Sequence, residues 1–157
     1  MESGGIMESS GIMTSGSTPG CETADAGTAL VPVMSAQPDR ATRLRSAALR
    51  DGERCVWCRR PCTGLVRATT DHLVPKVKGG PSWLENEVVA CRRCNGERGH
   101  LSPADWLAEC ERRGWEPDVP AVVRALTALD RAIGERGGQR RARPYLAAQL
   151  RRLTRSS

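Results

Sequence analysis

The chain has 157 residues, a formal net charge of +6 and 3% aromatic residues, with no Phe and a single Tyr. So few large apolar side chains can form only a small core, which a bound metal would help to stabilise. No apolar run reaches the roughly 18–20 residues that span a bilayer, and no secretory leader pattern opens the sequence, so we expect a cytoplasmic protein with no membrane partner.

The first 37 residues are predicted to be a disordered, low-complexity tail. They are rich in Gly, Ser and Thr and hold an approximate repeat, MESGGI, MESSGI and MTSGST. Such a composition buries too little apolar surface to offset the entropy cost of ordering the chain. The remainder is expected to divide into a domain at 38–102 and a basic, helical C-terminal extension at 103–157.

The segment 38–102 has the pattern of a small α+β domain. Asp39 is a plausible N-cap for its first helix, and Gly52 a plausible end. In the next element, GLVRATT is a β-type run. The elements predicted in chain order are a helix at 38–52, a β-hairpin at 53–75, a loop at 77–86, and a short strand followed by one or two helical turns at 87–98.

Three helices are predicted in the C-terminal extension. Ser102 is a good N-cap, with Pro103 in the first turn, and the apolar residues that follow recur at helical spacing. The predicted helices cover 102–114, 118–138 and 144–155.

The basic residues are concentrated after the tail. Residues 1–38 contain four acidic residues and no basic one, whereas residues 136–157 contain seven arginines and no acidic residue. A basic body suits a polyanionic partner such as nucleic acid. The alternative is an arginine-rich, solvated surface, and charge alone does not separate the two.

Two CxxC pairs predict a structural metal site. CVWC and CRRC lie 32 residues apart, and in a reducing compartment such cysteines favour metal over disulfides. Tetrahedral zinc binds four soft ligands, and each CxxC turn supplies two thiolates. A redox dithiol is one alternative, and Cys62 is an alternative ligand. We therefore predict structural Zn²⁺ at Cys55, Cys58, Cys91 and Cys94.

Between the two pairs, the first of only two histidines directly follows an acid, in TTDHLVPKVKGG (69–80). The segment ENEVVACRRCN (85–95) comes next. Together with the flanking CxxC pairs, these motifs resemble the HNH nucleases, over about residues 50–100. The resemblance implies a small, zinc-stapled ββα-metal domain at 38–102, flanked by an N-terminal helix and the C-terminal helices.

The resemblance also implies roles for individual residues. Asp71 and Asn95 match the oxygen ligands of one catalytic divalent metal, Mg²⁺ or Mn²⁺. His72 matches the general base, since its ordinary pKa of about 6.5 suits proton transfer near neutral pH. Asn86 matches the asparagine that braces the loop and orients the histidine. The alternatives are a turn pair for Asp71 and His72, a loop cap for Asn86 and a helix C-cap for Asn95.

Four further residues are candidates for contacts to DNA. Arg98 stands where many relatives have a lysine, and we expect it at the scissile or an adjacent phosphate. His100 fits a phosphate or water contact, or a third metal ligand. Lys76 and Lys78 either contact DNA or are solvated loop charges.

These observations predict a metal-dependent HNH endonuclease that nicks or cuts DNA, in phage, restriction or mobile-element biology. One alternative is a zinc-ribbon DNA-binding module without catalysis, and another is a protein-interaction adaptor that uses the C-terminal helices. The intact set of Asp71, His72, Asn86 and Asn95 favours the first. The target, the pathway, and a protein partner or homodimer are left open by the sequence.

Overall fold

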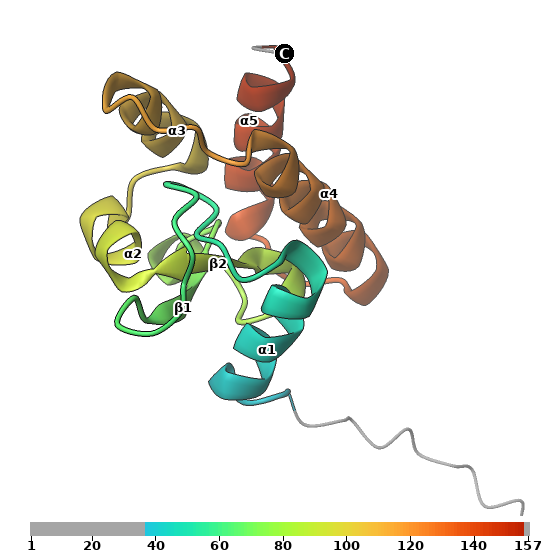
Figure 1. Cartoon of the computed structure of the whole chain (residues 1–157). Coiled ribbons are helices and arrows are strands. Elements are labelled where there is room, and N and C mark those ends of the chain that lie inside the picture. The colour runs from blue at the N-terminus through green and yellow to red at the C-terminus, as the bar shows by residue number, and fades with distance from the viewer. Residues whose placement is uncertain (1–36, 156–157) are drawn as a thin grey trace, which may run out of the picture. The chain divides into compact units, whose positions relative to one another are not determined.

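The computed structural model describes residues 37–155, which combine five α-helices with a two-stranded antiparallel sheet (Figure 1). The α+β fold class is therefore confirmed, whereas the predicted tail lies, apart from Gln37, outside the described residues. The elements are α1 (Arg40–Asp51), β1 (Ala68–His72), the 3-10 turns η1 (Lys76–Lys78) and η2 (Leu84–Asn86), β2 (Glu87–Cys91), α2 (Arg92–Arg98), α3 (Pro103–Arg112), α4 (Val119–Arg136) and α5 (Ala142–Thr154).

The sheet is formed by β1 and β2, so the hairpin predicted over 53–75 is wrong in its pairing. The antiparallel register sets Ala68 opposite Cys91 and His72 opposite Glu87. Residues that face each other across an antiparallel pair share one side of the sheet. The register therefore places the side chain of Glu87 on the same side as that of His72.

The segment before β1 folds into a compact turn around the first CxxC pair, here called the knuckle (residues 54–61). An isolated bridge between Arg54 and Pro61 closes it, and the Cys55 backbone N–H donates to Arg60 O at 3.0 Å. These bonds pair the two ends of the knuckle with each other rather than with β1. A hydrogen bond from Val56 N to Val89 O at 2.9 Å attaches the knuckle to β2 instead.

Helix α1 begins and ends as its sequence predicts. The Asp39 side chain accepts a hydrogen bond from Thr42 N at 2.7 Å, and Gly52, with φ at 86°, ends the helix. Arg50 fixes the helix beside the sheet, because its guanidinium donates to Leu84 O at 2.9 Å and to Glu87 O at 2.8 Å.

The loop between β1 and β2 is braced by Asn86, which is fully buried. Its Oδ1 accepts from Val74 N at 2.8 Å, and its Nδ2 donates to Val74 O at 3.0 Å and Pro81 O at 2.8 Å. Gly80 passes so close that a Cβ there would lie 1.8 Å from Val74 O. The loop is therefore a fixed structure rather than a flexible link.

The C-terminal helices share the core of the sheet and knuckle. Trp106 of α3, Leu126 of α4 and Leu146 of α5 belong to the same buried cluster as Trp57 of the knuckle. The domain boundary predicted at 102 stays a prediction. Residues on its two sides share one buried core. Within the described residues, no helix is long and apolar enough to cross a membrane.

Gly80→Ala tests the tightness of the braced loop. The added methyl would meet the Val74 carbonyl, so we expect a loss of about 3 kcal/mol in the free energy of unfolding. The matched control is Gly134→Ala in α4, where a Cβ meets nothing within 4 Å; there we expect a gain of about 0.5–1 kcal/mol. Denaturant unfolding of both variants measures the difference, and similar stabilities would contradict the placement of the loop.

Candidate metal centre and candidate active site

Four cysteine sulfurs converge at the junction of the knuckle with β2 and α2. The Sγ atoms of Cys55, Cys58, Cys91 and Cys94 all lie within 4.8 Å of one another, and those of Cys58 and Cys91 are 3.9 Å apart. Four sulfurs bound tetrahedrally at about 2.3 Å from zinc are about 3.8 Å apart. The arrangement therefore fits a closed zinc site, and Cys62, the alternative ligand, is not part of the cluster.

The backbone holds both cysteine pairs in place. Cys91 ends β2 and is also the N-cap of α2, where its sulfur accepts from Cys94 N at 3.5 Å. A hydrogen bond from Cys94 lowers the pKa of the Cys55 thiol to about 5, and the same bond raises the pKa of Cys94. Without a cation these two sulfurs do not both carry a charge, whereas a bound divalent metal stabilises all four thiolates.

Asp71 is 3% exposed, and both of its carboxylate oxygens are hydrogen bonded. Arg98 Nη1 donates to Oδ1 at 2.5 Å, and Trp57 Nε1 donates to Oδ2 at 2.8 Å. Burial raises the pKa of Asp71 to about 6, although Arg98 and Trp57 act in the opposite direction. The acid is thus held on the α2 side of β1 by a buried cation and an indole.

The burial of Arg98 corrects the predicted contact between this residue and a phosphate. Its side chain is 1% exposed, and besides Asp71 it donates to His72 O and Leu73 O, both at 3.0 Å. Its guanidinium also lies 5.4 Å from the centre of the Trp57 ring. A group so enclosed does not reach a phosphate; it connects α2 to the end of β1.

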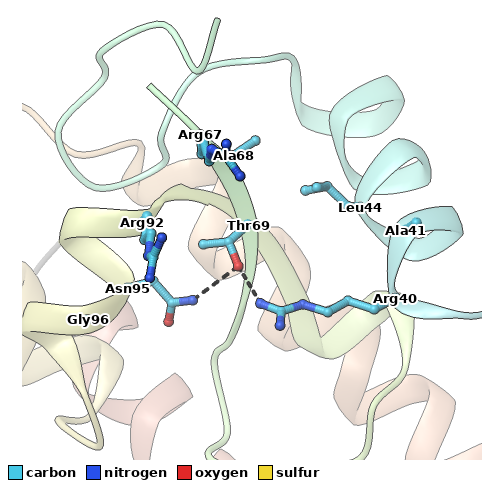
Figure 2. A pocket seen from close by; sticks show the side chains of 9 residues that line it. All are labelled: Arg40, Ala41, Leu44, Arg67, Ala68, Thr69, Arg92, Asn95 and Gly96. Carbon is cyan, nitrogen blue, oxygen red and sulfur yellow. Dashed lines mark hydrogen bonds between the residues drawn. The ribbon is translucent and has the colours of Figure 1, made fainter. Parts of the chain in front are cut away.

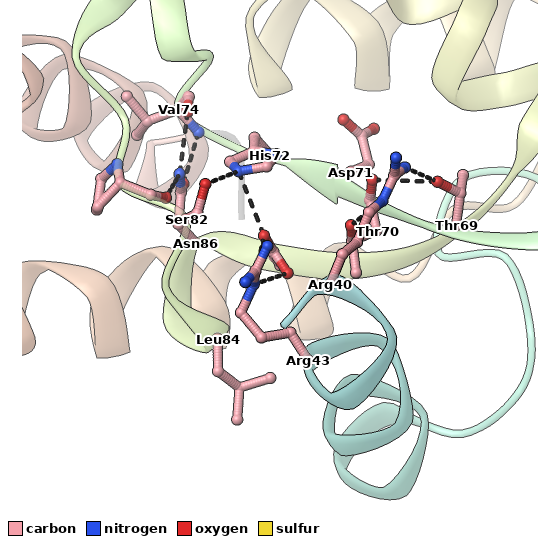
Figure 3. A network of polar contacts seen from close by, with 12 residues as sticks. Arg40, Arg43, Thr69, Thr70, Asp71, His72, Val74, Ser82, Leu84 and Asn86 are labelled. Carbon is pink, nitrogen blue, oxygen red and sulfur yellow. Dashed lines mark hydrogen bonds and ion pairs between the residues drawn. The ribbon is translucent and has the colours of Figure 1, made fainter. Parts of the chain in front are cut away.

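His72 ends β1 with its ring held by polar groups (Figure 3). Its Nε2 lies 3.3 Å from both Ser82 Oγ and Glu87 Oε1. Glu87 is fully buried, and Arg43 Nε lies 3.0 Å from each of its carboxylate oxygens. Burial, followed by the charges of Lys76 and Arg43, lowers the pKa of His72 to about 4. The imidazole is therefore neutral at neutral pH, and Nε2–H faces the carboxylate, so that Nδ1 carries the lone pair.

A small pocket of about 190 Å³ brings predicted site residues from three elements together. Asp71 and His72, the last two residues of β1, both line it. Asn95 of α2 donates from Nδ2 to Thr70 O at 3.2 Å, and within residues 37–155 its Oδ1 has no hydrogen-bond partner. The exposed His100 and Lys76 also line the pocket, whereas Lys78, also exposed, does not.

Sequence reasoning missed three residues that hold this site: Arg43, Trp57 and Glu87. The pairing of β1 with β2 would have indicated Glu87, because it lies directly opposite His72. Arg43 is one of four arginines in α1, and nothing in the sequence distinguishes it from the others. Trp57 stands inside the first CxxC pair, where the sequence gives no sign of a contact with Asp71.

Residues 55–101, from the first cysteine of the knuckle to just past α2, match the family model described as HNH endonuclease. With the four-cysteine cluster, this match shows an HNH endonuclease domain of the four-cysteine type. No curated protein and no solved structure matches the chain. Helix α1 and helices α3 to α5 lie outside the matched segment.

Replacement of a cluster cysteine should remove the metal together with the fold. Cys91→Ser is expected to lose bound zinc and cooperative unfolding, because structural zinc contributes about 10–16 kcal/mol of apparent binding free energy in small domains. Cys62→Ser is the matched control and should keep both. Zinc content per chain and thermal unfolding measure this, and equal zinc content in the two variants would rule the four-cysteine assignment out.

The buried pair of Asp71 and Arg98 gives a second expectation for stability. Arg98→Gln leaves the Asp71 carboxylate buried without its cation, which should cost about 3–5 kcal/mol. The control in the same helix is Arg93→Gln, which removes an exposed pair with Glu97 and a contact with the Trp115 ring and should cost less than about 1 kcal/mol. Denaturant unfolding compares them; an Arg98 variant as stable as the control would show that the pair is not buried as described.

Proposed function

We propose that the protein is a metal-dependent endonuclease that hydrolyses phosphodiester bonds of DNA at the pocket shared by Asp71, His72 and Asn95. The observation that carries this proposal is the placement of His72, whose ring lines the pocket while Glu87 and Ser82 hold its Nε2. A general base has to be unprotonated, oriented and open to the substrate. His72 is neutral, its Nε2 is held by Glu87 and Ser82, and it lines the pocket.

In the proposed reaction, Nδ1 of His72 accepts a proton from the attacking water. Glu87 holds the ring in the correct tautomer and stabilises the imidazolium that forms, as an orienting carboxylate does in other base–acid pairs. Arg43 balances the charge of Glu87 while His72 is neutral, so that the buried acid is never without a cation.

Asp71 and Asn95 are the proposed ligands of the catalytic metal, Mg²⁺ or Mn²⁺. A divalent cation bound there would stabilise charge on the transferring phosphoryl group and the leaving oxygen. Asn95 offers its unpaired Oδ1, and Asp71 offers the lone pairs that Arg98 and Trp57 leave free. His100 and Lys76, at the rim of the same pocket, are proposed to contact the metal or a phosphate.

One observation favours a second function, a DNA-binding module without catalysis. Both oxygens of Asp71 accept hydrogen bonds and the side chain is 3% exposed, so a metal would have to share this carboxylate with Arg98. In that function the arginine-rich domain, with its metal centre, binds DNA, and the pocket cleaves no phosphodiester bond. We propose a reducing compartment such as the cytoplasm in either case, because none of the four cluster cysteines forms a disulfide.

Nicking of supercoiled plasmid tests the choice between the two functions. Wild-type protein and the His72→Ala variant are each incubated with plasmid under three conditions: without added metal, with Mg²⁺ and with Mn²⁺. Loss of a general base should lower the rate of nicking by roughly 10²–10⁴-fold. Thr127→Ala, on the exposed side of α4, is a control substitution outside the pocket.

Fold and zinc content are measured for each variant, because His72→Ala should keep both. Metal-dependent nicking that only the His72 variant loses supports the endonuclease. If the protein binds DNA but nicks it with neither metal, the endonuclease is rejected in favour of the DNA-binding module without catalysis. Nicking that survives in His72→Ala would reject His72 as the base.

A further inference from the structure

A second, larger pocket lies on the other side of Asn95, and we call it the basic groove. Its volume is about 730 Å³, and it lies between α1, β1 and the start of α2 (Figure 2). Arg40, Arg67 and Arg92 line it, and its lining contains neither an acidic nor an aromatic residue. The proposed active-site chemistry uses none of these three arginines.

The fold brings the three arginines together from segments far apart in the sequence. The Arg92 backbone N–H donates to Arg67 O at 3.1 Å, which places the start of α2 beside the residue before β1. From α1, Arg40 donates to the hydroxyl of Thr69 and, at 3.3 Å, to that of Thr70. Each of the three arginine side chains is exposed.

These cations lack the partners that most neighbouring arginines have. Within residues 37–155, neither Arg67 nor Arg92 makes an ion pair or a side-chain hydrogen bond, and the partners of Arg40 are neutral hydroxyls. Arg93, the next residue after Arg92, pairs with Glu97, and Arg43, one turn after Arg40, pairs with Glu87. Positive charge in the groove is therefore uncompensated, which favours a polyanion.

The basic groove and the small pocket have one residue in common. Asn95 lines both, and its Nδ2 lies 3.4 Å from Thr69 Oγ1, the same hydroxyl that Arg40 contacts (Figure 2). A polyanion bound in the groove would thus lie beside the residue proposed as a metal ligand.

We propose that the basic groove binds the sugar–phosphate backbone of the DNA strand next to the bond being cut. Guanidinium groups bind phosphate oxygens in pairs of hydrogen bonds, whereas the absence of an aromatic residue leaves no platform for stacking a base. Binding is therefore independent of base sequence and sensitive to salt. This inference rests on the proposed function, because it assigns the strand that is cut to the groove.

The test compares two variants that lose the same charge. The groove variant is Arg40→Gln, Arg67→Gln, Arg92→Gln, and the control is Arg124→Gln, Arg140→Gln, Arg155→Gln, which removes three exposed arginines from the C-terminal part. Fluorescence anisotropy measures the Kd for a labelled DNA duplex without added divalent metal, from about 50 to 200 mM salt, the range over which phosphate binding dominates affinity.

We expect the groove variant to bind roughly tenfold or more weakly than wild type. The slope of log K against log salt should become shallower by about 0.9 for each phosphate that is no longer neutralised, hence by roughly 2.7. The control should keep the wild-type slope more closely. Equal losses of affinity in the two variants, an unchanged groove variant, or a wild type that does not bind the duplex would each overturn the inference.

A double variant, Arg67→Gln with Arg92→Gln, guards against a folding defect, because neither side chain has a hydrogen bond to lose within residues 37–155. Its expected change in slope is about 1.8. The nicking assay separates this inference from the proposed function. If wild type nicks DNA while the groove variants keep full affinity, only the inference fails. If the groove variants lose affinity but wild type nicks in no metal, the catalytic function fails, and the groove remains a site for the DNA backbone without a bond that is cut beside it.

Discussion

The antiparallel pairing of β1 with β2 is the constraint on which the rest of the structure depends. It sets Cys91 at the end of β2, beside the knuckle, so that four sulfurs from distant segments meet. At the other end of the ladder, the same register sets His72 opposite Glu87. A shift by one residue would reverse the side of the sheet for every side chain of β2. It would separate the histidine from its carboxylate and displace the cysteines together.

The two adjacent residues Asp71 and His72 are held by different sets of neighbouring side chains. Arg98 of α2 and Trp57 of the knuckle bind the carboxylate of Asp71, while Glu87, with Arg43 of α1 behind it, holds the ring of His72. Each buried charge thus has its own partner, and the polar groups do not compete. The four-cysteine cluster contributes indirectly, because it joins the knuckle to the start of α2.

Short-range signals in the sequence predicted much of this arrangement. Asp39, Gly52 and Ser102 marked helix ends where the structure has them, and equal CxxC spacing predicted the four-cysteine cluster. Strand pairing was harder, because the β-type run 64–70 follows the first CxxC pair closely and suggested a local hairpin. The closure of the knuckle by its own backbone hydrogen bonds leaves no mark in composition.

The direction of individual side chains was the other limit. Arg98 is charged and follows a motif asparagine, so the sequence favoured contact with a phosphate; only the packing of the last turn of α2 against β1 turns it inward. Asn86 shows the opposite case, because the brace implied by the resemblance is seen in its three hydrogen bonds to the loop. The roles of Asp71, His72 and Asn95 in catalysis stay predictions.

Helix α1 lies outside the segment that matches the HNH family, yet it supplies Arg43 to the buried Glu87 and Arg40 to the basic groove. Grafting of residues 55–101 alone into another protein would therefore carry the buried Glu87 without its counter-charge and leave the basic groove without one of its walls. The smallest transferable unit begins at the cap of α1, sixteen residues before the matched segment. Natural or engineered shuffling of this domain would have to move that helix with it.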